Sequence, residues 1–209
     1  MPSILPDESF SRHELELLHD VSASIQAFSD LNDLLRHILK KIKAAFGIEG
    51  ASIALHDAEA KEFFFIRTVE EENDADREDT DPMRFPDHYG VAGWVFRENR
   101  SVIIPDVERD ERFANTLNLQ QSFQTRSMIC TPLNTAKERI GVLYALNKQK
   151  GTFTEHEMRL LEVLAGPIAI SIENARLYGE LKRHADNLAS ENVRLKAEVQ
   201  NRFNLQGVI

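Results

Sequence analysis

Apolar residues recur at helical spacing in two segments near the start of the chain. The first carries five of them: Leu15, Leu18, Val21, Ile25 and Phe28. The second runs from Leu31 to Phe46, with Asp30 placed to cap its start, Asp33 three residues later, and Gly47 placed to end it. This spacing predicts two amphipathic helices ahead of any sheet.

Between these helices and residue 148 the apolar residues alternate with a period of two or form short runs, which is typical of strands. The expected strands are Ala51–Leu55, Phe63–Val69, Val102–Ile104, Met128–Leu133 and Ile140–Asn147. A polar turn joins the first two, which predicts that they pair. Both faces of the last are apolar, so it is expected at the centre of a sheet covered on both sides. Gly90–Val95 is expected to lead into a short helix.

From Thr154 the pattern is helical almost to the end of the chain. Thr154 and Glu157 form a capping box, T-x-x-E, before the first apolar positions. Pro167 lacks a backbone N–H and is expected to bend the helix. The order of helices, strands and a final long helix predicts an α+β fold, with an antiparallel sheet flanked by helices.

A heptad pattern occupies the last part of this helix and predicts a parallel homodimer. The seam consists of Tyr178, Leu181, Ala185, Leu188, Asn192, Leu195 and Val199. Asn192 at an inner position favours an in-register pair, in which it bonds to its own copy, and Glu191 and Lys196 have the spacing of an interchain ion pair. The alternative is a solvated, monomeric helix.

Composition places the chain among folded domains. The 209 residues are 42% hydrophobic and 28% charged, which suits one domain of about 150 residues with an extension. A signal peptide and a membrane-spanning apolar run are both missing from the pattern, so a cytoplasmic location is expected. Cys130 is the only cysteine, so a disulfide framework is excluded; it is expected to act as a small hydrophobe.

The net charge of −9 is concentrated in one segment, Glu70–Asp81, where eight of twelve residues are acidic and only Arg77 is basic. Its composition predicts a solvated, mobile loop, and it lacks the glycine of an EF-hand calcium loop. The chain shows no Lys/Arg patch with interleaved aromatics, which argues against a nucleic-acid partner.

Three stretches in order resemble the GAF family of small-molecule sensor domains: GVAGWVFRENRSVIIPDVERDERF (90–113), FQTRSMICTPL (123–133) and GVLYALNKQKGTFTEHEMRLLEVLAGPIAISIENARLY (141–178). The resemblance covers about residues 12–180 and implies a ligand pocket between one face of the sheet and the loops of the middle segment. It implies that Val91 and Ala92 offer backbone groups to the ligand. The pocket walls would include Phe113, Asn115, Thr125 and Tyr144, and Arg126 would clamp an anionic ligand or pair with the acidic loop.

The chain is also similar to the cyclic-nucleotide-binding GAF domains of phosphodiesterases. Asn147, Lys148 and Phe153 match their N-K, F and D-E signature, whereas Glu157 replaces the Asp and Met158 the Glu. Glu157 has a second explanation as a helix cap, and Lys148 as its partner. A cyclic nucleotide is therefore one candidate ligand, and the cofactor stays unassigned.

The final segment, YGELKRHADNLASENVRLKAEVQNRFNLQGVI, resembles the linker that precedes the AAA+ module of bacterial sigma-54-dependent activators, and it contains no P-loop. The expected organisation is a tail (1–11), a GAF sensory domain (12–176), a coiled-coil linker (177–202) and a lead-in (203–209) to an effector domain outside this chain. The expected function is ligand sensing that controls this effector through a dimeric helix.

Two other interpretations stay open: the sensory half of a cyclase or histidine kinase, and a structural dimeriser whose pocket is filled by its own side chains. Enzymatic activity is not expected, because the sequence contains no recognisable Ser/His/Asp or Cys/His arrangement. No metal site is assigned, because the seven histidines are scattered and the carboxylates of Asp106, Asp110 and Glu111 are better explained as loop caps than as iron ligands.

Overall fold

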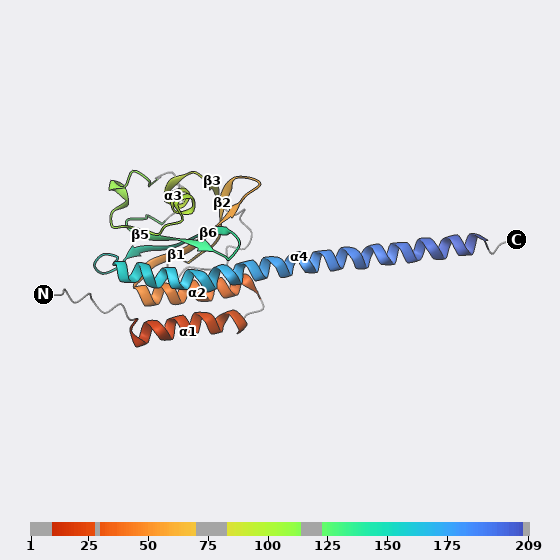
Figure 1. Ribbon diagram of the computed structural model, residues 1–209, viewed down its shortest axis with the longest axis horizontal. Coiled ribbons are helices and arrows are strands. Elements are labelled where there is room, and N and C mark those ends of the chain that lie inside the picture. The colour runs from red at the N-terminus through yellow and green to blue at the C-terminus, as the bar shows by residue number, and fades with distance from the viewer. Residues whose placement is uncertain (1–9, 28–29, 70–82, 114–122, 207–209) are drawn as a thin grey trace. The chain divides into compact units, whose positions relative to one another are not determined.

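The computed structural model describes residues 10–27, 30–69, 83–113 and 123–206. The chain forms two compact units, Met1–Ser171 and Ile172–Ile209. In the first unit, six strands form one sheet in the order β3-β2-β1-β6-β5-β4, and every neighbouring pair is antiparallel. Helices cover the sheet (Figure 1), so the expected α+β fold is confirmed.

The strands lie close to the expected segments. They are β1 (Ile48–Asp57), β2 (Glu62–Val69), β3 (Arg84–Pro86), β4 (Val102–Ile104), β5 (Met128–Asn134) and β6 (Arg139–Lys148). The prediction that the last strand is central is confirmed, because β6 lies between β1 and β5. Gly141 of β6 is required there, since a Cβ atom at this position would lie 2.2 Å from the carbonyl oxygen of Ala54.

The main helices are α1 (Arg12–Ala27), α2 (Leu31–Phe46), α3 (Gly90–Glu98) and α4 (Glu155–Gln206). Within the first unit, α2 and the beginning of α4 lie on one face of the sheet, α3 lies on the other, and α1 packs on the outer side of α2 (Figure 1). The expected caps of α2 are confirmed: the Asp30 side chain accepts a hydrogen bond from the Asp33 N–H, and Gly47 ends the helix in the left-handed conformation, with φ of 57°.

The predicted buried face of α1 is partly wrong. Leu17, Val21 and Ser24 are the buried positions, whereas Leu15 is 53% exposed. The helix packs on α2 through the stripe of Leu17, Val21 and Ser24, and Leu15 lies on the opposite side of the helix and stays in solvent. Periodicity identified the helix, and its packing on α2 decided which side faces inward.

The capping box at the start of α4 is confirmed. The Glu157 N–H donates to Thr154 Oγ1 at 3.2 Å, and the Thr154 N–H donates to Glu157 Oε2 at 3.0 Å. The helix then runs through Pro167 without a break. The Ser171 hydroxyl donates to the Pro167 carbonyl at 2.7 Å. The bend expected at Pro167 stays a prediction.

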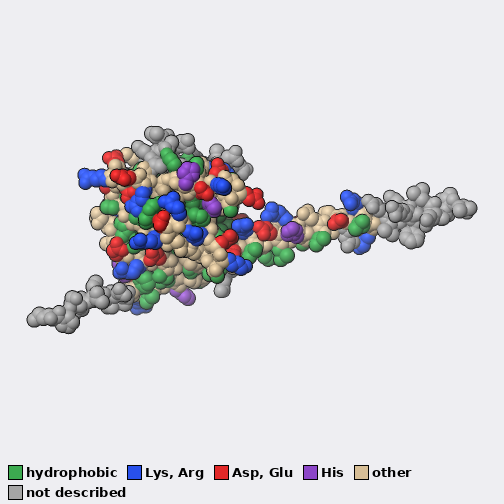
Figure 2. Space-filling view, turned by 45° about the horizontal axis from the view of Figure 1, so that its top comes forward, with side chains coloured by type: hydrophobic (Ala, Val, Ile, Leu, Met, Phe, Trp, Pro, Cys, Tyr) green, Lys and Arg blue, Asp and Glu red, His purple; other side chains and the backbone are tan. Residues whose placement is uncertain are grey.

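The second unit is the continuation of α4 from Ile172 to Gln206. Five of its described apolar side chains lie in solvent, and Figure 2 shows such side chains at the surface of this helix: Leu177 is 49% exposed, Tyr178 74%, Leu181 and Leu188 66%, and Leu195 49%. None of the described helices is long and apolar enough to cross a bilayer.

Several expectations fall outside the described residues. They are the acidic segment Glu70–Asp81, the proposed wall residue Asn115, the side chains of Asn192 and Val199, and residues 207–209.

Candidate functional site

The face of the sheet beneath α3 carries a cross-strand row of three buried residues with a polar or sulfur atom. Ser52 of β1 lies opposite Tyr144 of β6, which in turn lies opposite Cys130 of β5. Ser52 is 1% exposed, Tyr144 7% and Cys130 0%. The row places a serine hydroxyl, a phenol and a thiol side by side in an otherwise apolar surface.

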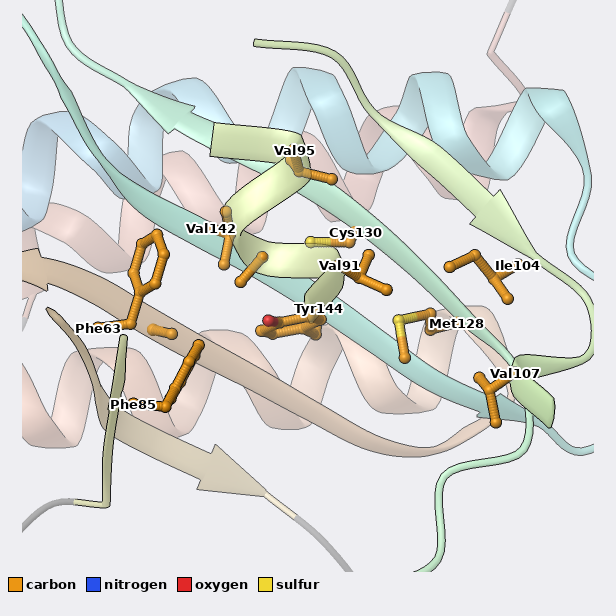
Figure 3. Packing of buried hydrophobic residues seen from close by; sticks show 12 residues of the cluster. Phe63, Phe85, Val91, Val95, Ile104, Val107, Met128, Cys130, Val142 and Tyr144 are labelled. Atoms are coloured by element: carbon orange, nitrogen blue, oxygen red, sulfur yellow. The ribbon is translucent and has the colours of Figure 1, made fainter. Parts of the chain in front are cut away.

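Apolar and aromatic side chains surround this row (Figure 3). The cluster includes Phe63 and Phe85 at one end, Ile104, Val107 and Met128 at the other, and Val91 and Val95 of α3 above. Phe63 and Phe85 have ring centroids 5.4 Å apart, and Phe65 lies 6.3 Å from the Tyr144 ring. Aromatic walls with a few polar atoms are typical of small-molecule sites.

The first turn of α3 packs against the same region. Tyr89 is its N-cap residue and makes no side-chain capping bond, so the first N–H groups of α3 are not satisfied by that side chain. Gly93 allows the close approach of this turn to the preceding loop, because a Cβ atom there would lie 2.5 Å from the His88 carbonyl carbon. Val91 and Ala92, at this end of α3, are 5% and 2% exposed.

A histidine and a carboxylate meet beside the aromatic wall. His56 Nε2 lies 3.2 Å from Asp87 Oδ2, and the His56 side chain is 15% exposed. The imidazole ring also contacts Phe96 at 4.4 Å and Phe63 at 5.4 Å between centroids. The pair links β1 to the loop that precedes α3.

Burial governs the chemistry of the two ionisable groups in the row. It raises the pKa of the Cys130 thiol well above its usual value, so the sulfur stays protonated and is a poor nucleophile. Burial also raises the pKa of Tyr144, and the neighbouring Cys130 adds to the increase. Both groups are neutral near pH 7 and serve as packing surface or as hydrogen-bond partners.

Asn147 organises the rim of the site. Its side-chain oxygen accepts hydrogen bonds from the N–H groups of Arg126 and Ser127, at 2.7 and 3.3 Å. Its side-chain nitrogen donates to Glu49 at 2.9 Å and to the Gln124 carbonyl at 2.8 Å. It is 1% exposed and has a φ of 57°, a conformation that asparagine tolerates better than most residues. This network fastens the segment before β5 to β1 and β6.

Arg126 belongs to the same network. Its guanidinium lies 2.5 Å from Glu49 Oε1, and its side chain is 56% exposed. The sequence left Arg126 either with an anionic ligand or with the acidic loop; in the described residues its partner is Glu49.

The next residue, Lys148, connects the sheet to α4. Its ammonium group forms an ion pair with Glu157 and donates to the Phe46 carbonyl at the end of α2. The side chains of Lys148 and Glu157 are 15% and 19% exposed. The expected pairing of these two residues is confirmed, so the N-K part of the signature has a structural role in this chain.

The segment that follows β4, residues 106–112, is held by its own carboxylates. Asp106 accepts a hydrogen bond from the Glu108 N–H at 3.1 Å, and Asp110 pairs with Arg112 through two bonds of 2.8 and 2.6 Å. Arg112 lowers the pKa of Asp110 and lies 4.6 Å from the centroid of Trp94. Among the residues the structure describes, no three His, Cys, Asp or Glu side chains gather as a metal site.

The predicted site residues thus fall into two groups. Val91, Ala92 and Tyr144 belong to the cluster and Phe113 packs against it, whereas Arg126 lies at the rim. Thr125, half-buried, lies in the segment that Asn147 holds.

Sequence reasoning missed Ser52 and the pair of His56 with Asp87. The alternation of β1 was a usable signal for Ser52, because it puts a serine on the same face as Ala54. Nothing in the sequence brings His56 and Asp87 together, since 31 residues separate them.

Comparison with known proteins decides the family. The GAF domain model matches residues 30–172. The chain belongs to the GAF domain family. Its sheet and helices superpose on the GAF domain of a phosphoenolpyruvate-protein phosphotransferase from Coxiella burnetii with a TM-score of 0.71 and 18% identity, covering 82% of this chain and 99% of that one. A free methionine-R-sulfoxide reductase from Neisseria meningitidis gives a TM-score of 0.64 at 22% identity, over 81% of this chain and 96% of the other.

Curated relatives of this GAF domain include regulators and enzymes. The Nif-specific regulatory protein of Herbaspirillum seropedicae is 23% identical over 100% of this chain and 38% of its own length. A formate hydrogenlyase transcriptional activator of Salmonella typhimurium is 24% identical over 91% of this chain and 28% of its own length. A dual cyclic-AMP and -GMP phosphodiesterase 11A of Takifugu rubripes is 32% identical over 46% of this chain and 11% of its own length. The chain therefore spans about a tenth to two-fifths of these relatives, and the expected likeness to transcription activators is confirmed.

Proposed function

We propose that this GAF domain senses a small molecule and regulates an effector domain joined to it in a longer protein. The observation that carries the proposal is the combination beneath α3: uncapped backbone donors above a buried row of Ser52, Tyr144 and Cys130, with aromatic walls. Backbone N–H groups at a helix start favour an anionic or carbonyl group of a ligand. The aromatic walls favour a planar ring.

The effector is proposed to be the AAA+ module of a sigma-54-dependent transcription activator. The support is the similarity to the Nif-specific regulatory protein, which extends over the whole chain and therefore includes α4. The phosphodiesterase relatives favour a second candidate, in which a cyclic nucleotide occupies the site. Both candidates use the same face of the sheet.

A thermal-shift screen tests the sensing role. The folded protein is scanned against cyclic nucleotides, 2-oxo acids and other central metabolites. A ligand at about a hundred times its dissociation constant adds about 2.7 kcal/mol of stability, which raises the melting temperature by at least about 5 °C in a domain of this size. Tyr144→Phe and Thr125→Val should each reduce the shift, because each removes a hydroxyl with little change of shape.

The control variant is Ser190→Lys, on the exposed surface of α4 and outside the sheet unit. A ligand that binds Tyr144→Phe and Thr125→Val as tightly as the original chain occupies another site. A broad library without a stabilising compound would leave the structural-dimeriser interpretation in place of the sensor.

We further propose that α4 forms a parallel homodimer through its exposed leucines. Leu181, Leu188 and Leu195 repeat every seven residues and together leave an apolar stripe in water. Sedimentation at micromolar concentration should give twice the chain mass of 23.8 kDa. Leu188→Lys should yield monomer and Ser190→Lys should not. A monomer in the unchanged chain contradicts the proposal.

A further inference from the structure

A second hollow, separate from the sensing face, lies at the edge of the sheet. It is a groove of about 470 Å³ between the loop before β4, the end of β5 and the first turns of α4. Ligand sites in proteins typically measure about 300–1,000 Å³. None of its lining residues belongs to the hydrophobic cluster beneath α3.

The groove exists because β4 is shorter than its neighbour. β4 pairs only with Met128–Cys130, so the rest of β5 continues past the start of β4. Ser101, just before β4, still reaches across, and its hydroxyl lies 2.8 Å from the hydroxyl of Thr131. The next residue of β5 is Pro132, which has no N–H to donate to another strand. A stretch of sheet edge is left open beside α4.

Asn134, one of the residues that line this groove, has a side-chain oxygen without a hydrogen-bond partner among the described residues. The Asn134 side-chain nitrogen donates to Asn99 Oδ1 at 2.9 Å, while Asn134 Oδ1 is buried and has no hydrogen-bond partner among the described residues. Buried amide oxygens are nearly always satisfied, so the exceptions call for an explanation. This oxygen is closed off from solvent, so a molecule in the groove would contact the charged side chains around it instead.

Two opposite charges line the same groove. Arg100 comes from the loop before β4, and Glu162 comes from α4. Both side chains are exposed, and neither forms a hydrogen bond or an ion pair with another described residue. By contrast, Arg97 is paired with Glu98, and Arg139 donates to the carbonyls of Phe96 and Arg97. A positive and a negative group therefore face one hollow without neutralising each other.

We propose that this groove binds a small zwitterion, a free α-amino acid. Its carboxylate would lie against the Arg100 guanidinium, and its ammonium group would donate to Glu162. The side chain of the amino acid would lie over Met158 and Pro132, the two apolar residues of the groove. Because Met158 and Glu162 belong to α4, a bound amino acid would bridge the sheet edge and the helix that continues toward the C-terminus.

The test is a titration of the deuterated, ¹⁵N-labelled chain followed by amide chemical shifts. The probes are L-alanine, L-leucine and L-glutamine, each up to about 10 mM, with ethylamine and propionate as the two halves of alanine. At least one amino acid should give saturable shifts at residues 99–101, 131–134 and 158–162. It should bind at least about tenfold more tightly than either half-molecule, because only the zwitterion engages both charges.

The variants Arg100→Gln and Glu162→Gln should each weaken this binding at least about tenfold. Both residues are exposed, so the fold is kept. The matched control Arg97→Gln, at a position outside the groove lining and paired with Glu98, should bind as before.

The proposal is overturned if none of the amino acids shifts these amides, if propionate alone matches them, or if the two variants bind unchanged. Shifts confined to residues 91–95 and 142–144 would also overturn it, and would instead place the amino acid at the sensing face. If no amino acid binds in the groove, the thermal-shift test of the face beneath α3 is unaffected.

Discussion

The two faces of the central sheet differ in what they are made of. The face under α2 and α4 is filled mainly by aliphatic side chains, such as Leu39, Leu143 and Leu161, none of which is exposed. The face under α3 carries phenylalanines, a tyrosine, a serine and a cysteine, and it has a histidine paired with an aspartate at its border. Aliphatic packing stabilises without offering a ligand any polar atom. The face under α3 is less uniformly apolar, and its polar atoms are available for contact with the proposed ligand.

The largest expected effect is on the aliphatic face. Leu39→Ala should lower the free energy of unfolding by about 2–5 kcal/mol, because a fully buried leucine leaves a cavity between α2 and the sheet. Urea denaturation measures the loss. Leu15→Ala is the control, since Leu15 is 53% exposed and should change stability by less than about 0.5 kcal/mol. Equal losses of stability in the two variants would contradict the assignment of Leu39 to the core and of Leu15 to the surface.

The rim of the aromatic face comes next. Asn147→Ala should cost about 2–3 kcal/mol, because it removes four hydrogen bonds made by a side chain that is itself buried. Asn147→Gly distinguishes the loss of the side-chain hydrogen bonds from backbone strain, because glycine accepts the φ of 57° without strain. We expect it to recover only part of the stability that Asn147→Ala loses. Full recovery in the glycine variant would mean that the network contributes nothing.

The link from the sheet to α4 has a smaller expected effect. Lys148→Met should cost about 1.5–3 kcal/mol, because Glu157 and the Phe46 carbonyl each lose a charged donor in a half-buried setting. Arg12→Met removes an ion pair with Glu16 at a position that is 93% exposed, and should change stability by less than about 0.5 kcal/mol. Urea denaturation measures both free energies of unfolding. Equal losses in the two variants would mean that the Lys148–Glu157 pair contributes no more than an exposed ion pair.

The smallest effect is a pH dependence at the loop beside Trp94. Arg112 lowers the pKa of Asp110 in the folded chain, so this carboxylate stabilises the fold above its ordinary pKa of 3.8 and the contribution is lost as the pH falls through the folded pKa. Asp110→Asn should therefore be about 0.5–1 kcal/mol less stable at pH 7, with the difference shrinking below about pH 4. Thermal unfolding of both chains between pH 3 and 7 measures it. A difference that stays constant across this range would contradict the assignment.

The sequence by itself determined the elements and their ends. Hydrophobic periodicity located four helices and five of the six strands, and cap residues such as Asp30, Gly47 and Thr154 marked helix boundaries, because these signals depend on neighbours within a few residues. It also identified the central strand, since both faces of β6 are apolar, and it identified the family through three motifs in order.

Which side chains meet depends on the assembled fold. The pairing of His56 with Asp87, of Arg126 with Glu49 across 77 residues, and of Asn147 with the segment before β5 depends on strand order, which local periodicity does not encode. The inward face of α1 was decided by α2, its packing partner, and Leu15 was left outside. The groove beside α4 follows from the length of β4 relative to β5, a property of the assembled sheet that no single segment carries.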